Sequence, residues 1–291
     1  MAQLAGKIIR QFPKILRRLR AYLQIYRLFC RPNEVSRTLA KAVIEALHNK
    51  LTPEERTWVE KIESLRKELN LSTAEIIMPD YGAGAGDQEE NAEIKSSQRN
   101  VKTRIVGQMC LTASKPYLWT MFLFKLIRKF SPNVCLELGT CMGISACYQA
   151  AALKLNSRGK MITLEGAQSL AEIAQKNFRD LGFDNISLVI GRFQDTLNDV
   201  LKEHGPIDYA FIDGHHEEKA TIAYFEQILP FLSERAVLIF DDISWSEGMK
   251  RAWNTIEGNE NIALSIDLTN MGVCILEKGN MKKQSFNFRI S

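Results

Sequence analysis

The sequence has few of the residue groups that build disulfide frameworks and zinc sites. Its 291 residues include six cysteines and four histidines, and no two cysteines are spaced as Cys-x-x-Cys. Reduced thiols are therefore expected, and a zinc site is not. The sequence also lacks an apolar run long enough to cross a membrane, and it lacks the apolar core and cleavage site of a signal peptide. These absences predict a cytoplasmic protein.

Acidic residues are missing from one part of the chain. Residues 1–33 contain eight of the 38 Lys and Arg residues and none of the 34 Asp and Glu residues. The net charge of +4 therefore comes from this N-terminal arm, and the rest of the chain is slightly acidic. Because a nucleic-acid-binding domain carries its basic residues as a patch on the domain itself, no nucleic-acid partner is expected.

The N-terminal arm has the pattern of a basic amphipathic helix between residues 7 and 29. Its apolar stripe consists of Ile8, Phe12, Ile15, Leu19, Tyr22 and Tyr26. Such a helix either makes peripheral contact with an anionic membrane surface or packs its apolar side against its own domain or a second subunit. Packing is favoured because large exposed apolar faces are uncommon in proteins.

Two more helices are predicted before residue 71. One covers residues 34–50, and the other runs from residue 53 to about residue 70. The second has a clear start: Thr52 and Glu55 form a capping box, and Pro53 takes the first helical position. All three N-terminal helices are interpreted as a helical cap.

A glycine-rich and then polar segment follows at residues 79–100. Its composition cannot form a core and predicts a loop. The loop is interpreted either as a lid over a site, with Asp80 and Tyr81 as its candidate residues, or as a plain linker. Residues 101–130 are predicted to be helical, with a break near Lys115 and Pro116.

The rest of the chain is organised around the stretch from Val134 to Gly143. Residues 134–138 are a short apolar run with one acid, typical of a strand buried on both faces. Gly139 and Gly143 follow, and residues 144–155 have helical periodicity. A strand, a glycine turn and a helix together present backbone N–H groups to an anionic or polar ligand.

Strands and helices alternate regularly after this turn. Further strands are predicted at residues 160–164, 186–190, 207–212, 236–240, 263–268 and 272–276, with helices at 169–181, 196–203, 217–232 and 247–256. The last two strands are joined by three residues, too few for a helical crossover, so they must form an antiparallel hairpin. The predicted fold is an α/β doubly wound, mostly parallel seven-stranded sheet.

Acidic residues occur within or directly after four of the predicted strands. They are Glu137, Glu165, Asp213, Asp241 and Asp242. Ligands of open α/β sheets bind beyond the carboxyl ends of the strands, so these acids are expected to face one crevice. Glu165 follows the glycine turn by one helix and one strand, the position of an acid that binds ribose hydroxyls. The turn lacks the three-glycine spacing of dinucleotide sites, which favours a nucleoside without a pyrophosphate.

Residues from about 104 to 276 resemble class I S-adenosylmethionine-dependent methyltransferases. The resemblance is greatest to the O-methyltransferases of the catechol and caffeoyl-CoA type and their bacterial relatives. The matching motifs are Glu-Leu-Gly-Thr-Cys-Met-Gly (137–143), Thr-Leu-Glu (163–165), Gly-Arg-Phe-Gln-Asp (191–195), Phe-Ile-Asp-Gly-His-His (211–216) and Phe-Asp-Asp-Ile-Ser-Trp (240–245). The resemblance implies a methyltransferase domain over residues 101–291 and a variable cap over residues 1–100.

The resemblance also implies a set of site residues. The cofactor-binding residues would be Glu137, Gly139, Thr140, Gly143, Glu165, Phe193, Gln194 and Asp213. In metal-dependent members the corresponding acids bind magnesium, which here implies Asp213, Asp241 and Asp242 as ligands of a possible Mg²⁺ ion. Two positions depart from the family pattern: Asp242 replaces an asparagine, and Cys141 replaces a glycine.

His216 stands where catechol-type members have a catalytic lysine. Because neutral imidazole is populated near pH 7, His216 is the candidate general base, acting beside Asp213. The alternative is that His215 and His216 only cap the following helix. Trp245 either lines the acceptor pocket or packs.

The predicted function is methyl transfer from S-adenosylmethionine to a hydroxyl group of a small molecule, by an enzyme that, like many family members, forms a homodimer. A carboxylate or amine acceptor, including that of a peptide, remains an alternative because the motifs identify the cofactor and not the acceptor. The other alternative is a cofactor-binding module without catalysis, recruited through the basic N-terminal helix.

Overall fold

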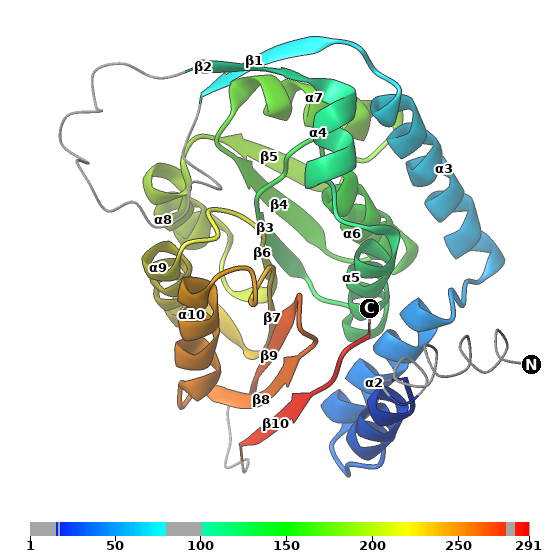
Figure 1. Ribbon diagram of the computed structural model, residues 1–291, viewed down its shortest axis with the longest axis vertical. Coiled ribbons are helices and arrows are strands. Elements are labelled where there is room, and N and C mark those ends of the chain that lie inside the picture. The colour runs from blue at the N-terminus through cyan, green and yellow to red at the C-terminus, as the bar shows by residue number, and fades with distance from the viewer. Residues whose placement is uncertain (1–15, 17, 80–100, 278–282, 291) are drawn as a thin grey trace, which may run out of the picture.

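The computed structural model describes residues 16, 18–79, 101–277 and 283–290 (Figure 1). The predictions for residues 7–15 and for the glycine-rich loop with Asp80 and Tyr81 lie outside the described residues. The described chain contains a large mixed sheet with helices on both faces, a two-stranded sheet, and N-terminal helices packed at one side.

The large sheet has the strand order β10-β8-β9-β7-β6-β3-β4-β5. Its strands are β3 (Val134–Leu138), β4 (Lys160–Glu165), β5 (Ile186–Ile190), β6 (Ile207–Ile212), β7 (Leu232–Phe240), β8 (Ile262–Asp267), β9 (Gly272–Glu277) and β10 (Gln284–Asn287). β9 is antiparallel to β7 and β8, whereas the other adjacent strands are parallel. This confirms the doubly wound fold and the predicted hairpin, with one strand more than predicted: β10 adds to the edge of the sheet beside β8.

Helices cover the two faces of this sheet in two groups (Figure 1). One face packs against α5 (Tyr117–Phe130), α6 (Ile144–Leu155) and α7 (Gln168–Asp180). The other packs against α8 (Phe193–His204), α9 (Glu218–Ile228) and α10 (Glu247–Gly258). A short 3₁₀ helix, η1 (Leu229–Phe231), follows α9 and completes the helical segment predicted at 217–232.

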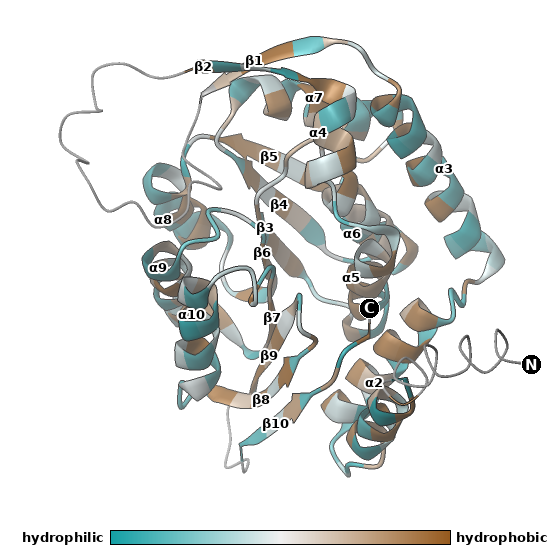
Figure 2. Cartoon of the chain, viewed as in Figure 1, coloured by the Kyte–Doolittle hydropathy of each residue, from teal (hydrophilic) through white to brown (hydrophobic). Residues whose placement is uncertain are grey.

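The core follows from the two-residue period of the strands. In β3, Cys135 packs with the first group of helices, while Leu136 and Leu138 pack with the second. The strands are therefore apolar on both faces, as the brown colour of the sheet in Figure 2 shows. Glu137 is the exception, because it is an acidic residue whose side chain is fully buried.

The N-terminal cap is built by α2 (Glu34–Leu47) and α3 (Pro53–Asn70). α2 packs on α5, and α3 packs on α6 and on the short helix α4 (Val106–Ala113). The predicted capping box of α3 is present, since Glu55 N donates to Thr52 Oγ1 and Thr52 N donates to Glu55 Oε2.

The basic N-terminal helix packs through a different face from the one predicted. Residues 18–29 are helical, and Ala21, Ile25 and Leu28 are buried in the main core. Tyr22 and Tyr26 of the predicted stripe are 41% and 64% exposed, and Leu19 is also exposed. No helix in the described part of the chain is both long and apolar enough to cross a membrane.

One predicted helix begins with a strand instead. Residues 101–105 form β2 (Val101–Ile105), which pairs antiparallel with β1 (Glu75–Pro79). The side chains of β2 are mostly exposed, because this small sheet lies at the edge of the molecule. The predicted break at Lys115 and Pro116 separates α4 from α5.

Candidate active site

The glycine turn lies where the sheet changes winding direction. β3 pairs with β4 on one side and with β6 on the other, so the turn after β3 opens into the crevice between their carboxyl ends. Gly139 has a φ of +103°, and a Cβ there would lie 2.0 Å from the carbonyl oxygen of Asp213. Gly143 has a φ of +83°, and its Cβ would lie 2.5 Å from the Phe178 ring. Both positions therefore require glycine.

Hydrogen bonds fasten the turn to β4. The backbone N–H groups of Gly139 and Thr140 both donate to the carbonyl oxygen of Leu164, at 3.0 and 3.2 Å. The hydroxyl groups of Thr140 and Thr163 lie 2.6 Å apart, and Thr163 Oγ1 donates to Glu137 Oε2 at 2.6 Å. The turn, the second strand and the buried acid thus form one hydrogen-bonded unit.

Glu137 is the most deeply buried acid of the site. Burial raises the pKa of its carboxyl group to about 7, against hydrogen bonds from Thr163, Ser145 and Gln149 that lower the pKa. The Gln149 amide donates to Glu137 Oε1 at 2.7 Å. Glu137 therefore changes protonation state close to neutral pH.

Glu165 joins the end of β4 to the glycine turn. Its Oε2 accepts the backbone N–H of Cys141 at 2.8 Å, and its Oε1 accepts that of Ala167 at 2.9 Å. Burial raises the pKa of Glu165 in spite of these bonds. Each oxygen keeps a second lone pair that can accept a hydroxyl hydrogen. Cys141, which replaces the family glycine, has a φ of +49°, so the turn keeps the backbone conformation that glycine adopts most easily.

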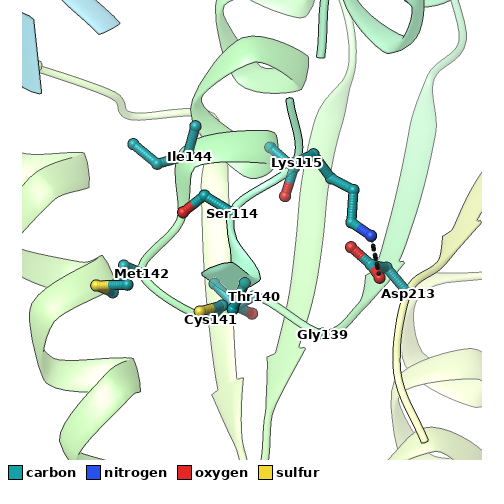
Figure 3. Close-up of a pocket in the computed structure, with 10 residues that line it drawn as sticks. Ser114, Lys115, Gly139, Thr140, Cys141, Met142, Ile144 and Asp213 are labelled. Atoms are coloured by element: carbon teal, nitrogen blue, oxygen red, sulfur yellow. Dashed lines mark ion pairs between the residues drawn. The ribbon is translucent and has the colours of Figure 1, made fainter. Parts of the chain in front are cut away.

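The acids after β6 and β7 share a lysine as their partner, and Figure 3 shows its ion pair with Asp213. Lys115, from the link between α4 and α5, places its Nζ 3.1 Å from Asp213 Oδ1 and also donates to Asp241 Oδ2. Asp241 is only 3% exposed. Burial raises the pKa of Asp213, while the nearby charges of Lys115 and His216 lower it.

His216 lies on the outer side of this cluster. Its Nε2 is 3.7 Å from Asp213 Oδ1 and 3.8 Å from Asp242 Oδ2. His215 instead bonds Tyr224 through Nδ1 at 2.8 Å. Neither histidine caps α9, whose N-cap residue is Glu217 and whose first turn has no side-chain cap.

The predicted adenine residues lie at the start of α8. Phe193 is half-buried and packs edge-on against Tyr224, with ring centroids 5.7 Å apart. Gln194 is exposed. Trp245, in the loop after β7, is 68% exposed, so it does not pack into the core.

A small pocket lies between the glycine turn and the α4–α5 link (Figure 3). Its lining residues are Ala113, Ser114, Lys115, Gly139, Thr140, Cys141, Met142, Ile144, Ser145 and Asp213. Three of the predicted cofactor residues (Gly139, Thr140 and Asp213) thus line the same pocket. Lys115 lines it too, although the sequence reasoning did not select it as a site residue.

The predicted metal ligands have a different arrangement from a magnesium site. Mg²⁺ binds oxygen atoms at about 2.0–2.1 Å in octahedral geometry. Among the residues that the structure describes, no group of three or more His, Cys, Asp or Glu side chains is arranged to hold a metal ion. The ammonium group of Lys115 bridges two of the three predicted ligands, and Asp242 lies next to His216 instead. As described, these residues do not fit the ion.

Four residues of the site were not predicted from the sequence. Thr163, Gln149 and Ser145 bond Glu137, and Lys115 bonds Asp213 and Asp241. A signal for Lys115 was present, because it is a charged residue at the break between two largely apolar helices, just upstream of the glycine-turn strand.

Comparison with known proteins agrees with this geometry. A family model described as a methyltransferase domain matches residues 136–243. This segment runs from within β3 to just past β7 and includes every residue predicted to bind the cofactor or a metal ion or to act as the base. A search of curated protein sequences finds no match.

Solved structures share the fold. An O-methyltransferase from Bacillus cereus in complex with SAH (S-adenosylhomocysteine) is 23% identical, with a TM-score of 0.50; the match covers 57% of this chain and 84% of that one. An SAH-bound methyltransferase from Podospora anserina is 17% identical, with a TM-score of 0.51 and coverage of 57% and 81%. A putative caffeoyl-CoA O-methyltransferase from Staphylococcus aureus is 17% identical, with a TM-score of 0.50 and coverage of 56% and 85%.

At these identities the solved structures establish the fold, and the family match covers the strands and turns that build the crevice. The chain therefore contains a methyltransferase domain, built on the fold of class I S-adenosylmethionine-dependent methyltransferases.

Proposed function

We propose that this enzyme transfers the methyl group of S-adenosylmethionine to a hydroxyl group of a small molecule. One observation carries the proposal: at the carboxyl ends of the central strands, His216 lies beside Asp213 at the edge of the crevice into which the glycine turn opens. An imidazole at this place can accept the proton that a hydroxyl acceptor must lose. The structural neighbours named as O-methyltransferases support the same choice.

The cofactor is proposed to bind across the turn. Glu137, Gly139, Thr140, Gly143 and Asp213 would surround its methionine end, because the pocket beside the turn is formed by this segment and Asp213. Glu165 would bind the ribose through the lone pairs that its backbone bonds leave. Phe193 and Gln194 would flank the adenine. When bound, S-adenosylmethionine supplies a methyl group on a positively charged sulfur.

His216 is proposed as the general base. The acceptor oxygen forms the new bond to the methyl carbon as the carbon–sulfur bond breaks, and the O–H proton passes to an imidazole nitrogen of His216. The products are a methyl ether and S-adenosylhomocysteine. The carboxylates of Asp213 and Asp242 lie 3.7 and 3.8 Å from His216 Nε2 and would stabilise the positive charge of the protonated ring. Because attack must be in line with the breaking bond, positioning supplies much of the rate.

Calorimetric titration with S-adenosylmethionine and S-adenosylhomocysteine tests the cofactor site. Glu165→Gln should weaken binding of both, because the amide nitrogen cannot accept a hydroxyl hydrogen. Glu172→Gln, on the exposed side of α7, is the matched control and should bind as the wild type does. Unchanged affinity in Glu165→Gln would contradict the cofactor assignment.

A screen of phenols, sugars, carboxylic acids and amines, read out as S-adenosylhomocysteine released, tests the acceptor class. His216→Ala should keep cofactor affinity and lose turnover of a hydroxyl acceptor. His48→Ala, at the C-terminal end of α2, should keep both the cofactor affinity and the turnover of the wild type. Turnover confined to amines, or full turnover by His216→Ala, would overturn the proposal.

A further inference from the structure

We propose that Lys115 supplies the positive charge at the acidic end of the site, so that methyl transfer requires no divalent metal ion. The inference rests on the proposed function, because it concerns the same strand ends where the acceptor would bind. Its principal test measures metal binding and not turnover, so the two can fail separately.

The ammonium group of Lys115 lies between two of the acids. Lys115 Nζ pairs with Asp213 after β6 and with Asp241 after β7. These carboxylates come from adjacent parallel strands, so their separation is fixed by the sheet. A cation held between them occupies the place where an ion shared by both acids would have to bind.

Lys115 and its two acidic partners are largely buried. The side chain of Lys115 is 13% exposed, and those of Asp213 and Asp241 are 11% and 3% exposed. Two adjacent carboxylates removed from water repel one another and need a compensating positive charge. Lys115 meets that need within the chain itself.

The backbone of Lys115 is held in place by the cap helix α3 and by Pro116. The carbonyl oxygen of Lys115 accepts a hydrogen bond from Arg66 Nη1 of α3 at 2.8 Å, and Arg66 Nε is paired with Glu63 at 2.9 Å. Pro116 follows immediately and restricts the backbone conformation of Lys115. The residue is thus anchored by the cap helix and directed toward the acids.

The third predicted metal ligand serves another purpose here. Asp242 Oδ2 lies 3.8 Å from His216 Nε2. Its φ of +52° is one that Asp and Asn adopt more readily than most residues, so an aspartate in place of the family asparagine keeps the backbone. The extra negative charge of this aspartate faces an imidazole that becomes positive when it accepts a proton.

Titration with Mn²⁺, followed by the loss of the electron paramagnetic resonance signal of the free ion, tests the proposal. The wild-type enzyme, alone and with S-adenosylhomocysteine, should bind no ion at this site, and its turnover should be unchanged after chelator treatment. Lys115→Met keeps most of the side-chain volume and removes the charge. It should bind one Mn²⁺ per chain at least about tenfold more tightly than the wild type, because the two carboxylates lose their cation.

Two further variants locate the ion. Adding Asp241→Asn to Lys115→Met should abolish the new binding. Lys154→Met, which removes a more exposed lysine paired with Asp184, should behave as the wild type does. If Lys115→Met does not fold, Lys115→Gln and the wild-type titration still decide the question.

Stoichiometric Mn²⁺ binding by the wild type that is weakened by Asp241→Asn would overturn the proposal, since Lys115 would then yield its place to a metal ion. Chelator-sensitive turnover restored by Mg²⁺ would overturn it as well. Absence of Mn²⁺ binding in folded Lys115→Met would show that these acids are not a cation site, which also contradicts the proposal.

Discussion

Arg66 Nη1, on the cap helix α3, donates a hydrogen bond of 2.8 Å to the carbonyl oxygen of Lys115, which lines the pocket beside the glycine turn. Arg66 also pairs with Glu63, which accepts the hydroxyl hydrogen of Tyr148 from α6 at 2.8 Å. The cap is therefore connected by polar contacts both to the methyltransferase core and to the residue that neutralises its acids.

Replacing Arg66 by alanine should lower both the unfolding free energy and the kcat of the enzyme. The Lys115 carbonyl loses a charged donor, a bond worth about 1.5–3 kcal/mol, and the lysine loses its anchor. Urea unfolding should show a loss of this size, and steady-state kinetics a fall in kcat. Arg56→Ala, an exposed arginine of the same helix, should change neither. Equal activity of the two variants would mean that α3 does not position Lys115.

The unfolding free energy of the protein should depend on pH because of the raised pKa of Glu137. Its folded-state pKa of about 7 exceeds the ordinary glutamate pKa of 4.5, so the folded state holds one proton more between these pH values. This contribution is complete below about pH 4.5 and is lost as pH rises through about pH 7, a decline of about 3 kcal/mol.

Glu137→Gln has no such proton to lose. The difference in unfolding free energy between wild type and Glu137→Gln, measured by urea unfolding across this range, should therefore fall by that amount as pH rises. Glu226→Gln, an exposed glutamate of α9, should follow the wild-type curve. A pH-independent difference would place the pKa of Glu137 outside the range.

Gly139→Ala should damage the turn. The added Cβ would lie 2.0 Å from the Asp213 carbonyl oxygen, in a backbone conformation with φ of +103°. We expect a loss of about 3 kcal/mol in unfolding free energy and loss of cofactor binding by calorimetry.

Gly182→Ala is the matched control for Gly139→Ala. Its φ of +71° is also positive, but no atom lies within 4 Å of the added Cβ. It should show the smaller cost of the backbone conformation alone, with cofactor affinity intact. Equal effects of the two substitutions would mean that the approach to Asp213 is not what requires glycine.

Lys125→Met should destabilise the junction of cap and core. The Lys125 ammonium, 3% exposed, bonds Glu55 Oε2 at 2.6 Å and lies 3.4 Å from Glu45. Burial would raise the pKa of Glu55, but its hydrogen bonds with Lys125, Thr52 and Arg128 outweigh burial and lower it. Removing Lys125 leaves a buried carboxylate uncompensated, at a cost of about 3–5 kcal/mol by urea unfolding.

Glu55→Gln in the Lys125→Met background should recover part of this loss, since the buried charge is then removed from both sides. Lys154→Met, whose partner Asp184 is 82% exposed, should cost about 1 kcal/mol or less. A double variant no more stable than Lys125→Met alone would contradict the charge explanation.

The strands of the central sheet were predictable because their side chains are buried on both faces. β3, β4 and β6 are nearly unbroken apolar runs between turn residues, and such runs have few alternatives. β2 was not found because its exposed residues show no burial pattern. β10 was missed for a similar reason, since Phe286 is its one fully buried residue.

The acids of the site could be placed from the sequence because each follows a predictable strand. Lys115 stands out in the sequence only as a charged residue at a helix break. Its partners could not be predicted, because it lies outside the strands and bonds an acid 126 residues further along the chain. Nothing local indicates that contact: only the packing of α5 on the sheet brings the two together. The prediction of which side of residues 18–29 is buried was wrong. It followed the aromatic side chains at helical spacing, whereas the helix packs through the side that includes the smaller Ala21.

β10 has a consequence for how molecules of this enzyme meet one another. It pairs in parallel with β8, from Gln284 opposite Leu264 to Asn287 opposite Asp267. Without it, β8 would present a row of unpaired backbone N–H and C=O groups at the rim of the sheet, a template for strand exchange between molecules. β10 pairs with these groups of β8. Because β10 is short and polar, it is a poorer template for pairing with a strand of another molecule. Residues 284–287 thereby protect the edge of β8 from pairing with a strand of another molecule.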